Sequence, residues 1–128
     1  MPAGQHRELY NGNIGSMAVN IGKLGAPHLY NYQYDQLNRI VAMDAYRGFN
    51  TAANNWNAIA VTQDYKERIS YDANGNILSY VRNGTITPPV GGAGGGLQTM
   101  DNMTYQYFKN TDGTLRNNRL RMVRDAVA

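Results

Sequence analysis

The chain has 128 residues, no cysteine, 14 glycines, ten tyrosines and a net charge of +3. One domain accounts for this length, the lack of cysteine excludes disulfides and thiol chemistry, and the small charge argues against nucleic acid as a partner. No apolar run is long enough for membrane insertion, and the tyrosine and glycine content favours strands and turns over a leucine-rich helical core.

The first strands are predicted in the N-terminal third of the chain. Three apolar residues alternate at the end of residues 7–21, as in a half-buried strand, and the glycines and proline of residues 22–27 break the pattern. Residues 28–34 alternate more clearly, because every second residue from position 30 is a tyrosine. A strand over residues 40–43 is expected to return antiparallel to it.

The middle of the chain is less regular. Residues 45–62 lack a clean period of either kind, so they are interpreted as an insertion between hairpins, with residues 51–56 as a candidate for a short helix. Strands are expected over residues 58–62 and 66–71, and the chain then turns and returns through residue 81.

The remaining residues predict two turns, a loop and a final strand pair. Asn83-Gly84 is a dipeptide that closes tight turns. Residues 87–97 hold two prolines and five glycines and are predicted to form a flexible loop. They do not form a phosphate cradle, because no GxGxxG register fits and no Lys-Ser or Lys-Thr follows the glycines. Residues 100–109 and 119–127 form the last strand pair, joined across residues 111–118.

Four segments share a pattern of Gly or Asn, then Asn or Arg, then Ile or Leu. The first position requires a residue that enters the left-handed backbone region at low cost, as Gly and Asn do. The third position is apolar and begins a strand. Tyr-Asp precedes two of the segments. The predicted structural positions of the repeat turns are Gly12, Tyr34, Asp35, Asn38, Ile40, Tyr71, Asp72, Gly75, Ile77, Asn118 and Leu120.

The two complete copies, residues 34–40 and 71–77, resemble the tyrosine-aspartate repeats of the RHS and teneurin-like superfamily, written YDxxGRL or YDxxGNI. Partial similarity extends to residues 9–14 and 100–105. The resemblance implies an all-β fold in which antiparallel β-hairpin repeats form a twisted or curved sheet strip, as part of a larger β-shell. It treats residues 1–128 as a single repeat region that carries the insertion and the glycine-rich loop.

In this family the shell encloses or presents a C-terminal effector or toxin domain. The resemblance therefore implies a structural, non-catalytic segment of a bacterial protein that is secreted or lies at the cell surface. Its implied partners are the remainder of its own parent chain and an effector or toxin cargo, and no cofactor is expected. An excised strip of this kind leaves unpaired sheet edges, so self-association through those edges is also expected.

The side chains that suggest chemistry have structural explanations. Asp35 and Asp72 each stand where a turn carboxylate accepts backbone N–H groups of its own turn, which predicts a structural role instead of acid–base chemistry. A calcium loop beginning at Asp72 lacks the glycine at the sixth position and the closing glutamate. His6 and His28 have no second ligand at strand or helix spacing, so zinc is not expected. No catalytic, metal-binding or cofactor-binding residue is predicted.

The tyrosines support a second hypothesis from another functional class. A surface adhesion or glycan-binding module would use exposed tyrosines and Trp56 as stacking platforms. Core packing is the competing explanation, since tyrosine rings beside repeat turns cover the sheet while their hydroxyls reach a polar edge. Glycan binding that is lost in Trp56→Ala would favour the adhesion module.

Overall fold

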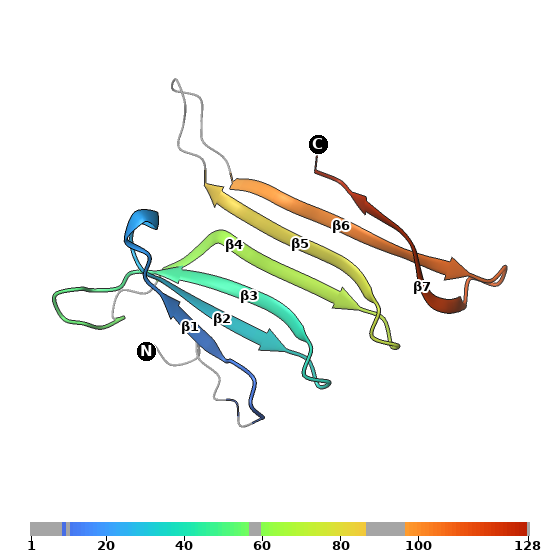
Figure 1. Cartoon of the computed structure of the whole chain (residues 1–128), viewed down its shortest axis with the longest axis horizontal. Coiled ribbons are helices and arrows are strands. Elements are labelled where there is room, and N and C mark those ends of the chain that lie inside the picture. Colours follow the sequence, from blue (N-terminus) through green and yellow to red (C-terminus); the bar gives the residue numbers. More distant parts are fainter. Residues whose placement is uncertain (1–8, 10, 57–59, 87–96, 128) are drawn as a thin grey trace, which may run out of the picture.

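The computed structural model describes residue 9 and residues 11–56, 60–86 and 97–127. The described residues form one sheet of seven strands, each antiparallel to the next, in the order β1 to β7 (Figure 1). The all-β prediction is confirmed, in the form of an open meander. A 3-10 turn, η1, covers Gly22–Leu24, and the strands are β1 (Ser16–Val19), β2 (His28–Tyr34), β3 (Ile40–Arg47), β4 (Ala60–Tyr71), β5 (Ile77–Ile86), β6 (Leu97–Lys109) and β7 (Leu115–Asp125).

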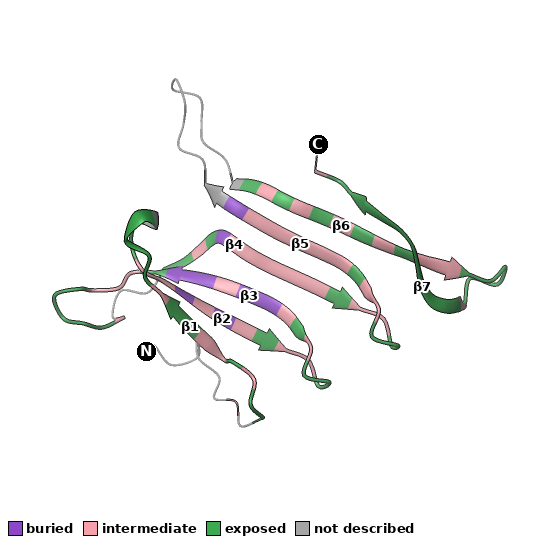
Figure 2. Ribbon diagram, in the orientation of Figure 1, coloured by how far each residue is buried: buried purple, intermediate pink, exposed green. Residues whose placement is uncertain are grey.

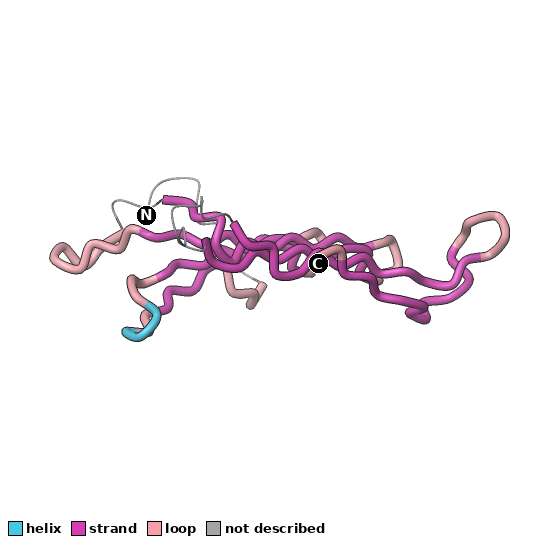
Figure 3. Tube along the Cα trace, turned by 90° about the horizontal axis from the view of Figure 1, so that it is seen from above, coloured by secondary structure: helices cyan, strands magenta, loops and turns pink. Residues whose placement is uncertain are grey.

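The sheet is a single layer. Viewed from above, the described strands lie in one thin band, with no second layer of described residues on either face (Figure 3). The accessible surface is 8905 Å², whereas a compact protein of 14.2 kDa exposes about 6,800 Å². A single-layer sheet produces such an excess, because most strands bury little beyond their contact with their neighbours.

The pairing register sorts the side chains onto two faces, since directly opposed residues share a face and neighbours along a strand alternate. One face, here the tyrosine face, is aromatic and apolar. The other carries mostly amide, hydroxyl and charged groups, such as the opposed pair Asn31 and Asp44, but in β2 and β3 it also holds the opposed pair Leu29 and Tyr46, both buried. The tyrosine face includes Tyr30, Tyr32, Met43, Ile69, Tyr80, Met103, Tyr105 and Val123.

The small core lies in the N-terminal half of the sheet. All the buried apolar side chains of the described chain come from β2 and β3, which is where the purple segments concentrate in Figure 2. In contrast, no residue of β7 is buried. The buried apolar residues are Leu29, Ala42, Met43, Ala45 and Tyr46.

Two local predictions are wrong. Residues 51–56 form no helix, because the backbone of Asn50 and Asn55 pairs in both directions, at 2.8 and 3.2 Å, and closes the segment as a turn. Asn83-Gly84 is not a turn, since both residues lie inside β5. Gly84 is buried there because β6 packs closely on it: a Cβ at this position would stand 3.0 Å from Cγ of Met100.

The segment interpreted as an insertion, residues 45–62, overlaps a strand at each end. Strand β3 continues to Arg47 and β4 includes Ala60, and residues 57–59 lie outside the described residues. The strands predicted over 58–62 and 66–71 are one strand, β4, with an irregularity in between. The predicted glycine-rich loop lies outside the described residues, apart from Leu97, which begins β6.

Candidate functional site

The repeat turns have one backbone geometry. In each of three hairpins the first turn residue donates its N–H to the fifth and accepts one from the fourth, as a bulged hairpin requires. The fourth residue has positive φ: 61° at Asn38, 88° at Gly75 and 84° at Gly113. The bonded pairs are Asp35–Arg39 and Asn38–Asp35, Asp72–Asn76 and Gly75–Asp72, and Asn110–Thr114 and Gly113–Asn110, all at 2.9–3.1 Å.

The two aspartates of the Tyr-Asp pairs are held inside their own turns. Oδ1 of Asp72 accepts the backbone N–H groups of Asn74 at 2.9 Å and Asn76 at 2.8 Å. The side-chain amide of Asn76, the largest contributor, and these N–H groups lower the pKa of the Asp72 carboxyl. The backbone N–H and then the guanidinium of Arg39 do the same at Asp35. Both carboxylates are therefore occupied as acceptors in turns.

The fourth predicted chain reversal is misplaced. Asn118 lies within β7, and the turn is centred on Gly113, five residues earlier. Sequence pattern alone selected Asn118-Arg119-Leu120 because it repeats Asn38-Arg39-Ile40 almost letter for letter. The backbone reverses instead where a glycine with an adjacent aspartate offers the turn geometry.

Asn118 nevertheless occupies a repeat position. Its Oδ1 accepts the side-chain amides of Asn74 at 3.3 Å and Asn76 at 3.0 Å, as Oδ1 of Asn38 accepts those of Asn11 and Asn13 at 2.6 and 3.4 Å. The last hairpin is therefore a repeat whose tip has been lengthened.

The register supports the same interpretation. Leu120 lies opposite Tyr107, just as Ile40 lies opposite Tyr34 and Ile77 opposite Tyr71, and a one-residue register shift precedes each of these tyrosines. Five residues lie between each of the first two tyrosines and its partner, and twelve lie between Tyr107 and Leu120, so the lengthened tip holds seven additional residues.

A tyrosine joins each repeat to the one before it. Three tyrosines on successive even-numbered strands donate their hydroxyls to the carbonyl oxygen of the isoleucine that follows the preceding repeat's turn. We call these contacts the tyrosine latches. They are Tyr34 to Ile14 at 3.0 Å, Tyr71 to Ile40 at 2.8 Å and Tyr107 to Ile77 at 2.9 Å.

An arginine reinforces one latch. The guanidinium of Arg39 lies 4.4 Å from the centre of the Tyr71 ring, within the range of a cation–π contact. Its Nη1 reaches the carbonyl oxygen of Asp72 at 3.5 Å, while its Nε pairs with Asp35 in its own turn at 2.6 Å. Arg39 therefore contacts a Tyr-Asp pair from the next repeat and the aspartate of its own.

A polar cluster that the sequence did not reveal lies at the opposite end of β2 to β4. Arg47 pairs with the carboxylate of Asp64, whose side chain is only 2% exposed, and its Nε donates to Nε2 of His28 at 3.0 Å. Partial burial, and then the positive charge of Arg47, lower the pKa of His28. These three residues are far apart in the chain and share no motif. They meet because β3 lies between β2 and β4.

The His28 cluster contains no nucleophile next to the histidine. Nε2 already accepts a bond from Arg47, and the ring packs against Tyr30 and Tyr65 at centroid distances of 6.1 and 5.9 Å. Tyr65 has a φ of 58° in the irregular part of β4, which gives its ring this position. The cluster is therefore best explained as a packed polar end of the sheet.

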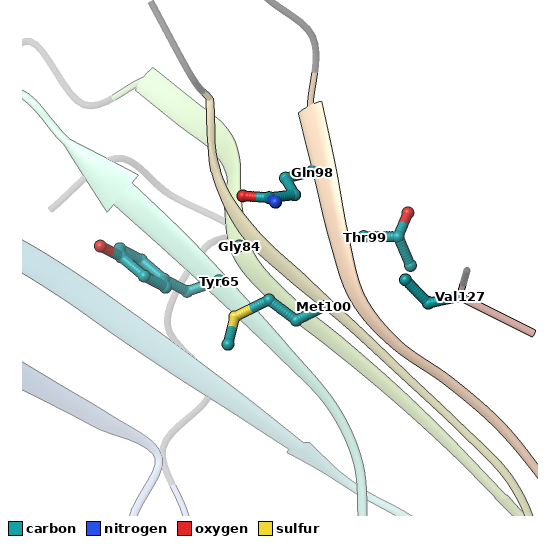
Figure 4. Close-up of a pocket in the computed structure, with 6 residues that line it drawn as sticks. All are labelled: Tyr65, Gly84, Gln98, Thr99, Met100 and Val127. Atoms are coloured by element: carbon teal, nitrogen blue, oxygen red, sulfur yellow. The ribbon is translucent and has the colours of Figure 1, made fainter. Parts of the chain in front are cut away.

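Tyr65 also lines an open hollow. It is lined by Tyr65, Gly84, Gln98, Thr99, Met100 and Val127, and Figure 4 shows Tyr65 and Met100 on one side of it with Thr99 and Val127 on the other. Its described lining residues include no histidine, carboxylate or cysteine.

The described residues bring together no group of three or more metal-ligating side chains, and none of their helices is long and apolar enough to cross a membrane. The fold and the repeat turns define a class: an open antiparallel meander of latched hairpin repeats. Comparison with protein-family models, curated proteins and solved structures finds no match for the chain.

Proposed function

We propose that this chain is a structural segment of an RHS-like β-shell, whose role is to form part of a wall that encloses or presents an effector or toxin domain. The observation that carries the proposal is the series of three tyrosine latches at equivalent positions. Each latch couples one hairpin to the next, so the strip grows sideways by adding hairpins and needs no second layer. A wall requires this kind of growth.

The chemistry of the described side chains supports a structural role. The aspartates accept turn N–H groups, and the latch hydroxyls are bonded to backbone carbonyls. Residues used in this way hold a backbone shape and leave little capacity for substrate. Export to the cell surface or medium as part of a larger protein belongs to the same proposal.

The adhesion hypothesis receives less support. Trp56 is half-buried and its ring packs against Phe49 at a centroid distance of 5.0 Å, so that part of its surface is already covered. A glycan array compares the wild type with Trp56→Ala, and binding that depends on Trp56 would favour adhesion over the shell.

The shell proposal is tested on the natural gene product, purified from its source without truncation. Electron microscopy is expected to show a hollow particle whose wall contains this strip, and protease treatment is expected to spare an enclosed polypeptide until the wall is opened with denaturant. A natural product that circulates as a solid particle or free strip, with no protected polypeptide, would contradict the proposal.

The latches are tested by a matched pair of substitutions on β6. Tyr107→Phe removes a hydroxyl that donates to the carbonyl oxygen of Ile77 at 2.9 Å. Tyr105→Phe removes a hydroxyl that makes only a weak contact with Sδ of Met103, at 3.9 Å. We expect Tyr107→Phe to lower the free energy of unfolding by about 1 kcal/mol, the net value of one hydrogen bond, and Tyr105→Phe to have a smaller effect. Urea titrations measure both, and equal effects would argue against the latch as the coupling between repeats.

A further inference from the structure

The outer edge of β7 has a backbone carbonyl group equivalent to those that accept the tyrosine latches. Strand β7 is the last in the sheet, and Leu120 stands in the register position of Ile40 and Ile77, opposite a latch tyrosine. Those two isoleucines each give their carbonyl oxygen to a tyrosine of the next repeat. No tyrosine of the described chain reaches the carbonyl oxygen of Leu120, and its side chain is 47% exposed.

Arg119 repeats the position of Arg39. Each follows an asparagine that accepts amide bonds from the preceding repeat, and each precedes the latch acceptor. Arg39 packs over the ring of Tyr71 and reaches the carbonyl of Asp72. Arg119 has no such partner in the described chain, and its guanidinium lies 5.9 Å from the ring of Phe108 on the neighbouring strand.

The charge of this edge defines what fits it. Arg116, Arg119, Arg121 and Arg124 are all exposed along β7, and within the described residues none of them forms an ion pair. The Nε of Arg39 pairs with Asp35, the residue that follows the latch tyrosine Tyr34. The residue that follows Tyr107 is a phenylalanine, so Arg119 has no carboxylate at the equivalent position. An incoming strand that ends in Tyr-Asp would supply a ring, a backbone carbonyl like the one that Arg39 contacts at Asp72, and a negative charge.

We propose that the β7 edge binds an extended, antiparallel strand ending in Tyr-Asp. The strand's backbone pairs with β7, its tyrosine hydroxyl donates to the carbonyl oxygen of Leu120, and its ring and aspartate lie against Arg119. Backbone pairing gives affinity of the kind seen when a peptide extends a sheet, and the Tyr-Asp contacts fix the register. This inference deepens the proposed function and rests on it, because it names the partner that the growing edge accepts.

The test uses the whole chain and a fluorescent peptide of its own β2 sequence, HLYNYQYD, which ends in Tyr-Asp at Tyr34-Asp35. Fluorescence anisotropy is expected to show saturable binding, and hydrogen exchange is expected to slow in β7 when the peptide is added. The peptide with Tyr34→Phe is expected to bind about threefold to tenfold more weakly, since it lacks the latch hydroxyl. The peptide with Asp35→Asn keeps the backbone carbonyl and loses only the charge, so a smaller decrease is expected.

Two variants of the protein carry the matched comparison. Arg119→Gln is expected to weaken peptide binding about fivefold or more, through loss of the ring and charge contacts. Arg116→Gln removes the same charge outside the repeat position and is expected to change binding less than about twofold, as an exposed charge does. Circular dichroism checks that both variants retain the wild-type strand content.

Three results would overturn the proposal. The first is a folded chain that does not bind the peptide, and the second is equal weakening by Arg119→Gln and Arg116→Gln, which would indicate charge attraction without a site. The third is a dimer whose β7 amides are protected without peptide, which would make a second copy the occupant. If Tyr107→Phe is destabilising as expected while the peptide fails to bind, the shell proposal stands and only the edge site is lost.

Discussion

The two halves of the sheet share one repeat geometry and differ in what covers it. Strands β2 and β3 supply every buried apolar side chain of the described residues, whereas β7 is exposed along its length apart from the half-buried Leu115 (Figure 2). The turns and latches are nevertheless the same in both halves. The comparison shows that this chain obtains its shape from hydrogen-bonded turns and much of its apolar stabilisation from one region.

The difference follows from which side chains are opposed. In β2 and β3, apolar side chains are opposed on both faces of the sheet, Leu29 to Tyr46 on one face and Tyr30 to Ala45 on the other. Strand β4 follows a curved path beside β3 at its irregular segment (Figure 1). In β6 and β7, the opposed positions include Thr104 with Arg124 and Gln106 with Met122. Polar and charged partners exclude little water, so this half gains less from burial.

The largest expected effect is truncation in the core. Leu29→Ala removes a side chain that is 2% exposed, and we expect the free energy of unfolding to fall by about 2 kcal/mol, near the lower end for leucine truncations because a thin sheet relaxes easily. Met122→Ala, the matched change on β7, removes a side chain that is 45% exposed and should cost less than about 0.5 kcal/mol. Urea titrations of both measure the contrast, and similar losses would remove the distinction between the halves.

A smaller effect is expected at the polar end of the N-terminal half. Arg47→Met removes the ion pair of the buried Asp64 carboxylate and the bond to His28. We expect a loss of about 1–2 kcal/mol, below the value for fully buried pairs because the Arg47 side chain is 48% exposed. Arg116→Met on β7 is the control. A loss no greater than in that control would show that the cluster contributes nothing to the stability of this half.

The smallest effects are in the dependence of stability on pH, and they separate the cluster from the turns. The pKa of His28 is lowered by folding, so the unfolded chain binds more protons, and stability should decline as the pH falls below about 6.5. The lowered pKa of Asp72 stabilises the fold above the ordinary carboxyl pKa of 3.8, and this contribution is lost as the pH falls through the folded-state value.

Two variants assign these steps. His28→Gln should abolish the decline in stability below pH 6.5 and leave the loss of stability at more acid pH. Asp72→Asn should reduce the loss at acid pH and leave the decline below pH 6.5. Thermal melts from pH 3 to pH 8 measure both. A wild-type curve that is flat between pH 5 and pH 7 would contradict the role given to His28.

The turns were predictable because their signal is local. Gly75 and Asn38 are needed where φ is positive, and Asp35 and Asp72 are needed where a carboxylate meets two N–H groups within four residues. The pattern therefore gave the two chain reversals at Asn38 and Gly75, and Gly12 has the positive φ that the pattern requires, 83°. It failed at Asn118. An asparagine there accepts amide hydrogen bonds from the neighbouring turn, and asparagine is also favoured at the positive-φ position of a turn, so the sequence pattern does not distinguish the two roles.

The sequence by itself determined the all-β class, most of the strands and the turns at Asp35–Arg39 and Asp72–Asn76, since these depend on alternation and on backbone preferences within a few positions. Only the tertiary structure decided which hydroxyl bonds which carbonyl, that His28, Arg47 and Asp64 meet, and that Asn83-Gly84 remains inside a strand. Those contacts join residues 17 to 31 positions apart in the chain. They depend on the register between strands, which is set by the summed contacts of whole strands and which no single motif encodes.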